Sequence, residues 1–167
     1  MIEWMRRALD GEVEVPMVGG GEVLHHPPTQ PEKWNDNSNF MALGNALKQE
    51  IDSVVDALRG VVVRKGNESR GLAVGTNAYT SQNEELAKPG EVGTGFHVDE
   101  RVGQVGFHLS LHRNGFHAVR KVADRDEVTD LIPFVEPITA TRQSVARLLV
   151  SLGNVVREAG WRISRDL

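Results

Sequence analysis

Two stretches of the chain carry apolar residues at helical spacing and predict long amphipathic helices. The first covers residues 38–59, and the second begins at residue 139 or 141 and ends at residue 160. Their apolar positions are Phe40, Leu43, Leu47, Ile51, Val54 and Leu58 in the first, and Val145, Leu148, Leu149, Leu152, Val155 and Val156 in the second. Such a stripe buries one face of each helix. Gly44 and Gly153 lie beside the stripes, where a glycine either permits close approach of another helix or is simply tolerated within its own helix.

The segment between these helices is typical of strands. Residues 105–111 alternate apolar and polar positions, which is the period of a half-buried strand. Asn114-Gly115 follows, a pair typical of two-residue hairpin turns, and residues 116–122 are expected to form the partner strand. This register places His112 directly opposite His117.

Further strands are predicted at residues 61–63, with a return strand at 72–74, and at residues 92–98 and 161–163. Residues 124–130 are highly charged and are expected to form a turn or a short helix.

Together these elements predict an α+β fold. We expect an antiparallel sheet of about five strands with a long hairpin, packed on two amphipathic helices, plus an extended N-terminal arm. Residues 1–37 are assigned to a short helix (residues 2–9) and this arm, and residues 38–167 to a single α+β core domain.

Composition narrows the functional classes. The net charge of −4 and an aromatic content of 5% argue against a strongly basic domain or a base-stacking surface for nucleic acid. Without cysteine, the chain has no disulfide and no thiolate nucleophile. No apolar run resembles a signal sequence or a membrane span. We therefore expect a cytoplasmic protein, or one within an assembled particle, that is not secreted by a signal peptide and has no membrane partner.

Five arginines follow residue 138 and give the C-terminal region a local positive charge. They are Arg142, Arg147, Arg157, Arg162 and Arg165. One hypothesis is that these arginines bind nucleic acid, which requires an affinity that falls steeply with salt concentration. A solvated helix face is the alternative.

Histidine is the residue type that offers candidate chemistry. His97 and Asp99 are two residues apart on a predicted strand and therefore face the same side, as two ligands of a facial triad do. His112 and His117, paired across the hairpin, would supply further imidazoles. The metal candidates are thus His97, Asp99, His112 and His117, against the alternative of a polar sheet face. No phosphate loop, dinucleotide loop or nucleophile elbow occurs, so we predict no cofactor.

Residues 10–37 are rich in proline and glycine and poor in apolar side chains. Such a segment has little core of its own and needs a surface on which to dock. We expect that surface to belong to the same domain or to a neighbouring subunit. The candidate partner-binding residues are Pro16, Val18, Val23, Leu24, Pro27, Pro28 and Trp34.

These features favour a non-enzymatic assembly or interaction protein, with self-association into a homo-oligomer or binding to another protein. The order of helix, sheet with a long hairpin and closing helix resembles that of small phage neck and tail-completion proteins. One alternative is an inhibitor or immunity-type binding protein. Another is a small metal-dependent or acid/base enzyme that uses the His/Asp cluster.

Overall fold

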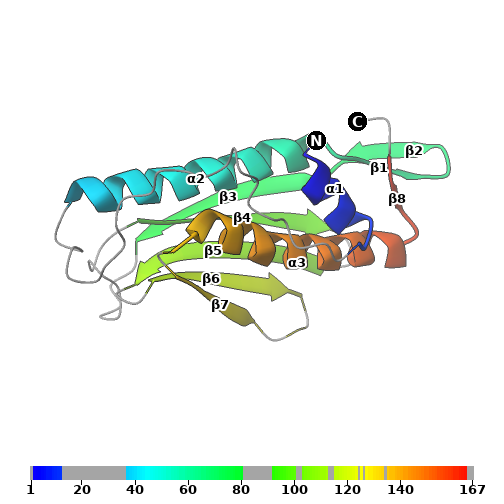
Figure 1. Ribbon diagram of the computed structural model, residues 1–167. Helices are drawn as coiled ribbons and strands as arrows, with labels where there is room; N and C mark the ends of the chain where they lie inside the picture. Colours follow the sequence, from blue (N-terminus) through cyan, green and yellow to red (C-terminus); the bar gives the residue numbers. More distant parts are fainter. Residues whose placement is uncertain are drawn as a thin grey trace.

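The computed structural model describes residues 2–12, 37–80, 92–100, 103–112, 115–123, 125, 127–133 and 135–164 (Figure 1). This part of the chain forms an α+β fold with three helices and two antiparallel sheets. The elements are α1 (Glu3–Leu9), α2 (Asn37–Arg59), β1 (Val62–Lys65), β2 (Glu68–Gly71), β3 (Ala73–Thr80), β4 (Val92–Glu100), β5 (Gly103–His112), β6 (Gly115–Val122), β7 (Val128–Ile132), α3 (Pro137–Glu158) and β8 (Arg162–Ile163). The predicted fold class is confirmed.

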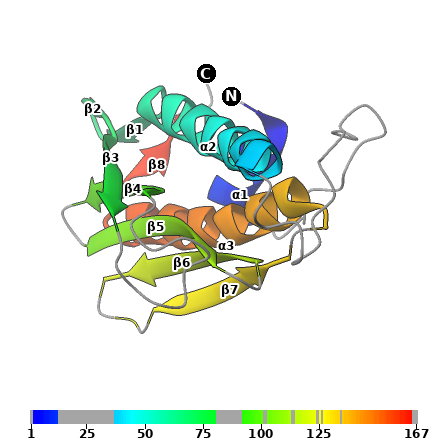
Figure 2. The same cartoon turned by 90° about the vertical axis from the view of Figure 1, so that its left-hand side faces the viewer.

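The larger sheet is an antiparallel meander in the order β3-β4-β5-β6-β7. Helix α2 contacts β3 and β4, whereas α3 contacts β5, β6 and β7, so the two helices share one face of the sheet. The sheet curves around this pair of helices, which leaves its opposite face turned away from them (Figure 2).

The hydrophobic core lies between the helices and the inner face of this sheet. The rings of Phe96 and Phe107, paired residues on β4 and β5, stack with centroids 5.7 Å apart. The predicted helical stripes supply the opposing layer, and their buried members include Leu47, Ile51, Val54, Leu58, Val145, Leu148, Leu149 and Leu152. The apolar period read from the sequence therefore marks the core side of both helices.

The smaller sheet, in the order β2-β1-β8, corrects one predicted pairing. Strand β1 pairs with β2 and not with residues 72–74, because a tight turn at Gly66 brings Glu68 opposite Lys65. Gly66 has a φ of +59°, which glycine adopts without a steric penalty. The chain from Ala73 onward is then free to enter the larger sheet as β3. The predicted edge strand is confirmed as β8, with Ile163 opposite Val63.

The expectation of a turn or short helix over residues 124–130 was wrong at its C-terminal end, where β7 begins. Strand β7 pairs with β6, and Asp130 is fixed from both sides. Its Oδ2 accepts hydrogen bonds from Arg120 Nε at 3.0 Å and from Ser144 Oγ at 2.5 Å. No local sequence pattern encodes these tertiary contacts. They stabilise residues 128–132 as a strand, although a highly charged run precedes them.

The N-terminal helix α1 belongs to the hydrophobic core, where Met5, Ala8 and Leu9 are buried. It packs on α3, and its last turn meets that helix at Gly153. A Cβ atom at position 153 would lie 2.0 Å from the carbonyl oxygen of Leu9. The same carbonyl accepts a hydrogen bond from Arg157 Nη1 at 2.7 Å. The predicted close approach at Gly153 is confirmed, whereas a Cβ atom at Gly44 would have no neighbour within 4 Å.

We predict that Gly153→Ala lowers the free energy of unfolding by about 1–3 kcal/mol, because α1 must move away from α3 to accommodate the methyl group. Gly44→Ala is the matched control within a helix, and it should be neutral or stabilise the protein by up to about 1 kcal/mol. Urea unfolding of both variants measures the difference. Equal effects of the two substitutions would contradict the close packing at Gly153.

Candidate functional site

The outer face of the five-stranded sheet, opposite the helices, carries the polar side chains of the alternating strands. On β4, Phe96 and Val98 are buried in the core, while His97 and Asp99 point to the outer face. On β5, Phe107 is buried and His108 faces outward. His117 on β6 is paired with Ser110 of β5, which lies on the same face as His108. Three histidines, His97, His108 and His117, therefore share the outer face.

Glycines flank the imidazole of His97 on both neighbouring strands. Gly75 of β3 and Gly106 of β5 are its direct cross-strand partners. A Cβ atom at Gly75 would lie 2.4 Å from His97 Cε1, so the ring occupies the space that a side chain at position 75 would fill. At Gly106 a Cβ atom would meet only the carbonyl oxygen of Phe96, at 3.9 Å. The imidazole thus lies over Gly75, and the surface above Gly106 is left open.

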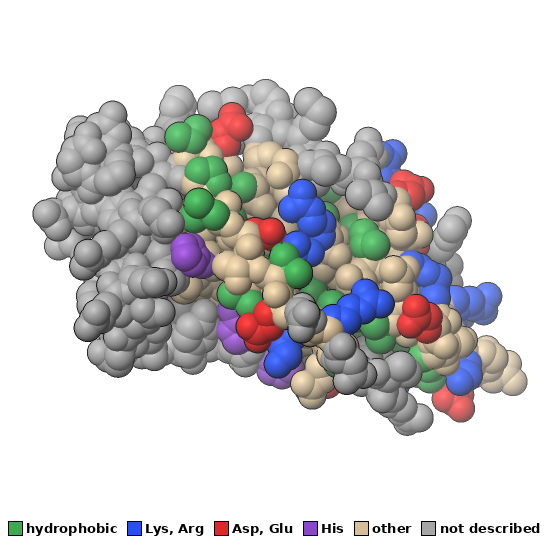
Figure 3. Space-filling model, turned by 90° about the horizontal axis from the view of Figure 1, so that it is seen from below, with side chains coloured by type: hydrophobic (Ala, Val, Ile, Leu, Met, Phe, Trp, Pro, Cys, Tyr) green, Lys and Arg blue, Asp and Glu red, His purple; other side chains and the backbone are tan. Residues whose placement is uncertain are grey.

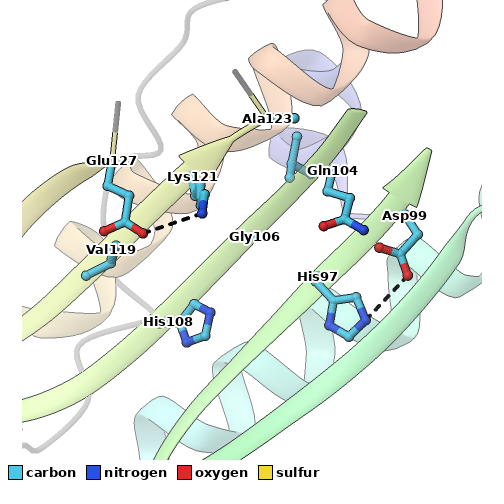
Figure 4. Close-up of a pocket in the computed structure, with 10 residues that line it drawn as sticks. His97, Asp99, Gln104, Gly106, His108, Val119, Lys121, Ala123 and Glu127 are labelled. Atoms are coloured by element: carbon cyan, nitrogen blue, oxygen red, sulfur yellow. Dashed lines mark ion pairs between the residues drawn. The ribbon is translucent and has the colours of Figure 1, made fainter. Parts of the chain in front are cut away.

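This open surface is a hollow of about 600 Å³. Figure 4 shows Gly106 between two walls: His97 and Asp99 lie on one side, and Lys121 and Glu127 on the other. Its full lining is His97, Asp99, Gln104, Val105, Gly106, His108, Val119, Lys121, Ala123 and Glu127. We call this site the sheet hollow.

One wall of the sheet hollow pairs an imidazole with a carboxylate, and the other is an ion pair. His97 Nε2 lies 3.6 Å from Asp99 Oδ2, and Lys121 Nζ lies 3.9 Å from Glu127 Oε1. The side chains of the second pair are about 60% exposed, so solvent screens their attraction. The site therefore presents one amide, two imidazoles, one ammonium and two carboxylates to an occupant.

His108 lies at one end of the sheet hollow and has a lowered pKa. Partial burial is the main cause, because it disfavours the charged imidazolium. The carboxylate of Glu127 raises the pKa, while the nearby His97 and Lys121 lower it further. His108 is consequently a neutral imidazole at pH 7, with one nitrogen able to donate and the other able to accept a hydrogen bond.

The hairpin register separates histidines that were expected to pair. His117 lies opposite Ser110, and His112 lies opposite Gly115, which is a shift of two residues from the predicted register. Gly115 is the first residue of β6, with a φ of +146°. A Cβ atom there would lie 2.5 Å from the carbonyl oxygen of Ile132. Glycine is thus required for close approach to β7 and not for the predicted turn position.

The four metal candidates do not converge in one site. His97 and Asp99 lie together, but His117 is four residues along β6 from Lys121, about 13 Å away, and two strands from His97. The backbone position of His112, opposite Gly115, is farther still along the sheet. Among the residues that the structure describes, no group of three or more His, Asp or Glu side chains is arranged to hold a metal ion.

Two of the C-terminal arginines have structural roles. Arg142 forms a double contact with the Glu50 carboxylate, with Nε 2.5 Å from Oε1 and both side chains less than a fifth exposed. Arg157 caps the end of α1 through the Leu9 carbonyl. These contacts remove two cations from the predicted basic face. Arg165 and the seven candidate partner-binding residues of the arm lie outside the described residues.

A second surface was not identified from the sequence. Strand β7 is an edge of the larger sheet, and Val128 and Leu131 on it are 45% and 54% exposed. Val135, just beyond the strand, is 72% exposed. We call these three residues the apolar edge. Seen from below, the molecule shows hydrophobic side chains interspersed with acidic and basic ones (Figure 3). Sequence analysis missed this surface because it predicted a turn or short helix over residues 124–130, although Val128-Thr129 is a strand-favouring pair.

No protein-family model, no curated protein and no solved structure matches this chain. In the described part of the chain, none of the helices has the length and apolar character needed to cross a membrane.

The lowered pKa of His108 predicts a pH-dependent stability. Its imidazole binds a proton less readily in the folded state than in the unfolded chain, where the pKa is about 6.5. The stabilisation is complete above pH 6.5 and is lost as the pH falls below that value. We expect His108→Gln to flatten the decline in the free energy of unfolding between pH 7 and pH 5.

The control is Gln104→Ala. Gln104 lines the same hollow but does not titrate, so this variant should keep the wild-type dependence of the free energy of unfolding on pH. Denaturant unfolding at several pH values measures both variants. If the free energy of unfolding of His108→Gln falls with pH as steeply as that of the wild type, His108 is not the source of this pH dependence.

Proposed function

We propose that this protein is a non-enzymatic assembly or interaction protein. The observation that carries the proposal is the apolar edge: a sheet edge with exposed large hydrophobic side chains. Exposed apolar residues on a strand with an unpaired edge are typical of surfaces that bind another protein chain. An inhibitor or immunity-type protein differs only in the identity of the partner, and the same surface supports it. Assembly within a phage-type particle, as a structural or tail and neck component, is one setting for such a function.

The arm is the second part of this proposal. The segment between α1 and α2 is joined at both ends to helices of the core, because α1 packs on α3 and α2 packs on β3 and β4. A partner bound by this segment would therefore be tethered to the folded domain through both ends of the segment. Its proline residues restrict the unbound chain and reduce the entropy lost on docking.

The test replaces the apolar side chains of the arm without changing its length. We expect the combined variant Val18→Ser, Val23→Ser, Leu24→Ser and Trp34→Ser to lose the oligomeric mass or the bound partner of the wild type, because it removes four apolar side chains from the arm. Multi-angle light scattering measures the mass, and thermal unfolding verifies that the core stays folded.

The control variant carries four polar replacements in the same segment: Glu22→Ser, Gln30→Ser, Lys33→Ser and Asn35→Ser. It should keep the mass and partners of the wild type. If the apolar variant also keeps them, the arm is not a docking segment and this part of the proposal fails.

The sheet hollow favours a second candidate function, an acid/base enzyme acting on a small polar molecule. His108 is a neutral imidazole suited to accept a proton, and the imidazole of His97, beside Asp99, is the second acid/base group of the hollow. Both border the open floor at Gly106. This candidate ranks second because the structure supplies the two groups without a defined substrate position between them.

Gly106→Leu tests whether the hollow binds small molecules. The added side chain would fill the floor, and the open surroundings of Gly106 allow the fold to persist. In ligand-observed NMR with a set of small carboxylates and phosphates, we expect compounds to bind the wild type and to lose binding in Gly106→Leu. Identical binding to both proteins, or no binding to the wild type, would exclude the hollow as a ligand site.

A further inference from the structure

We propose that the smaller sheet binds a phosphate group, held between the guanidinium groups of Arg64 and Arg162 beside the hydroxyl of Ser69. Arg64 on β1 lies directly opposite Arg162 on β8 and, on its other side, directly opposite Ser69 on β2. The three residues therefore form one row across the sheet, which we call the arginine row. It is separate from the apolar edge and from the sheet hollow, and it depends on neither proposed function.

The arginine row faces away from the hydrophobic core. Val63, the residue before Arg64 on β1, is fully buried. Successive residues of a strand point to opposite faces, so Arg64 and its cross-strand partners point outward. Arg162 and Ser69 are exposed, and Arg64 is partly buried. The smaller sheet lies at the end of the molecule where α3 ends (Figure 1).

The register of the strands sets two positive charges against each other. The Cβ atoms of directly opposite residues lie about 5 Å apart, and like charges at such positions destabilise a sheet. Strand β8 is held in this register by Ile163 opposite Val63 and by the hydrogen bond from the Ser164 amide to the Val62 carbonyl, at 2.8 Å. An anion between the two guanidinium groups would replace their repulsion with charge-assisted hydrogen bonds.

The other cations of the smaller sheet have contacts on its inner face. The guanidinium of Arg70 lies 4.4 Å from the centroid of the Trp161 ring, and Lys65 Nζ donates a hydrogen bond to the Ala159 carbonyl at 3.2 Å. Strands β1, β2 and β8 carry four cationic side chains and a single carboxylate, that of Glu68 opposite Lys65. This excess of positive charge attracts anions to the sheet.

The donors of the arginine row match a phosphate group better than a carboxylate. A phosphate monoester carries about two negative charges at pH 7 and three acceptor oxygens. Each guanidinium presents a planar fork of N–H donors, and the Ser69 hydroxyl adds a further donor. A carboxylate has one charge and two oxygens, which a single arginine satisfies.

The charge of the whole chain favours a compact ligand. Its net charge is −4, so the surface beyond the smaller sheet is negative on balance. That surface would repel an extended polyanion such as a nucleic acid. Inorganic phosphate, or the phosphate of a small molecule, contacts the arginine row alone.

The experiment titrates the full-length chain with inorganic phosphate at constant ionic strength, balanced with chloride, and follows binding by phosphorus NMR. We expect binding to the wild type and a rise in the dissociation constant of about tenfold or more in Arg162→Gln, which loses one set of charge-assisted hydrogen bonds. Arg162→Lys keeps the charge without the planar fork and should weaken binding less. Arg147→Gln, which replaces an exposed arginine on α3, is the matched control and should bind phosphate as the wild type does.

Arg162→Glu separates binding from stability. It sets a carboxylate opposite Arg64, so its free energy of unfolding without phosphate should equal or exceed that of the wild type. Phosphate should stabilise the wild type and leave Arg162→Glu unaffected.

Phosphate that does not bind the wild type, or that binds Arg162→Gln equally well, overturns the inference. Loss of phosphate binding in Gly106→Leu would place the ligand in the sheet hollow and also overturn it. Tighter binding of a single-stranded oligonucleotide than of phosphate would overturn the assignment to a compact ligand. None of these results affects the proposed assembly function, which is tested through the arm.

Discussion

The alternation of side chains along β4, β5 and β6 is the constraint on which both the core and the candidate site depend. Because helices α2 and α3 cover one face of the sheet, every second residue of these strands is committed to the core. The remaining residues are thereby gathered on the outer face. Phe96 and Phe107 stack on one side for the same geometric reason that His97 and His108 approach each other on the other side.

Glycine decides how much space that outer face contains. At Gly75 the missing side chain accommodates the His97 ring, and at Gly106 it leaves the floor of the sheet hollow open. Glycine weakens a strand because it contributes no packing and loses more backbone entropy on folding. In this sheet the neighbouring strands and the buried inner face hold the backbone in place, so the outer face can carry a depression. The partly buried His108 remains neutral there.

A polar network joins β7 to the rest of the fold, in addition to its pairing with β6. Asp130 joins β6 and α3 through Arg120 and Ser144, and these contacts bind the last strand to both layers of the fold. The result is an edge strand with two exposed apolar residues, Val128 on the helix side of the sheet and Leu131 on the outer face. In the proposed function, this edge and the arm are two separate means of binding another chain. The sheet hollow lies on the outer face, which it shares with Leu131 of the edge.

The local pattern of apolar and polar residues was sufficient to predict the fold class, both long helices with their buried stripes, the strand at residues 105–111 and the edge strand at 161–163. These features follow from local periodicity and from residues such as Gly153 beside a stripe. It also brought His97 and Asp99 together, because residues two apart on a strand share a face. The hairpin register, the strand at residues 128–132 and the separation of His117 from His97 became visible only in the folded chain. Those outcomes depend on contacts between distant segments, such as Gly115 against Ile132 and Asp130 against Ser144, which no local pattern encodes.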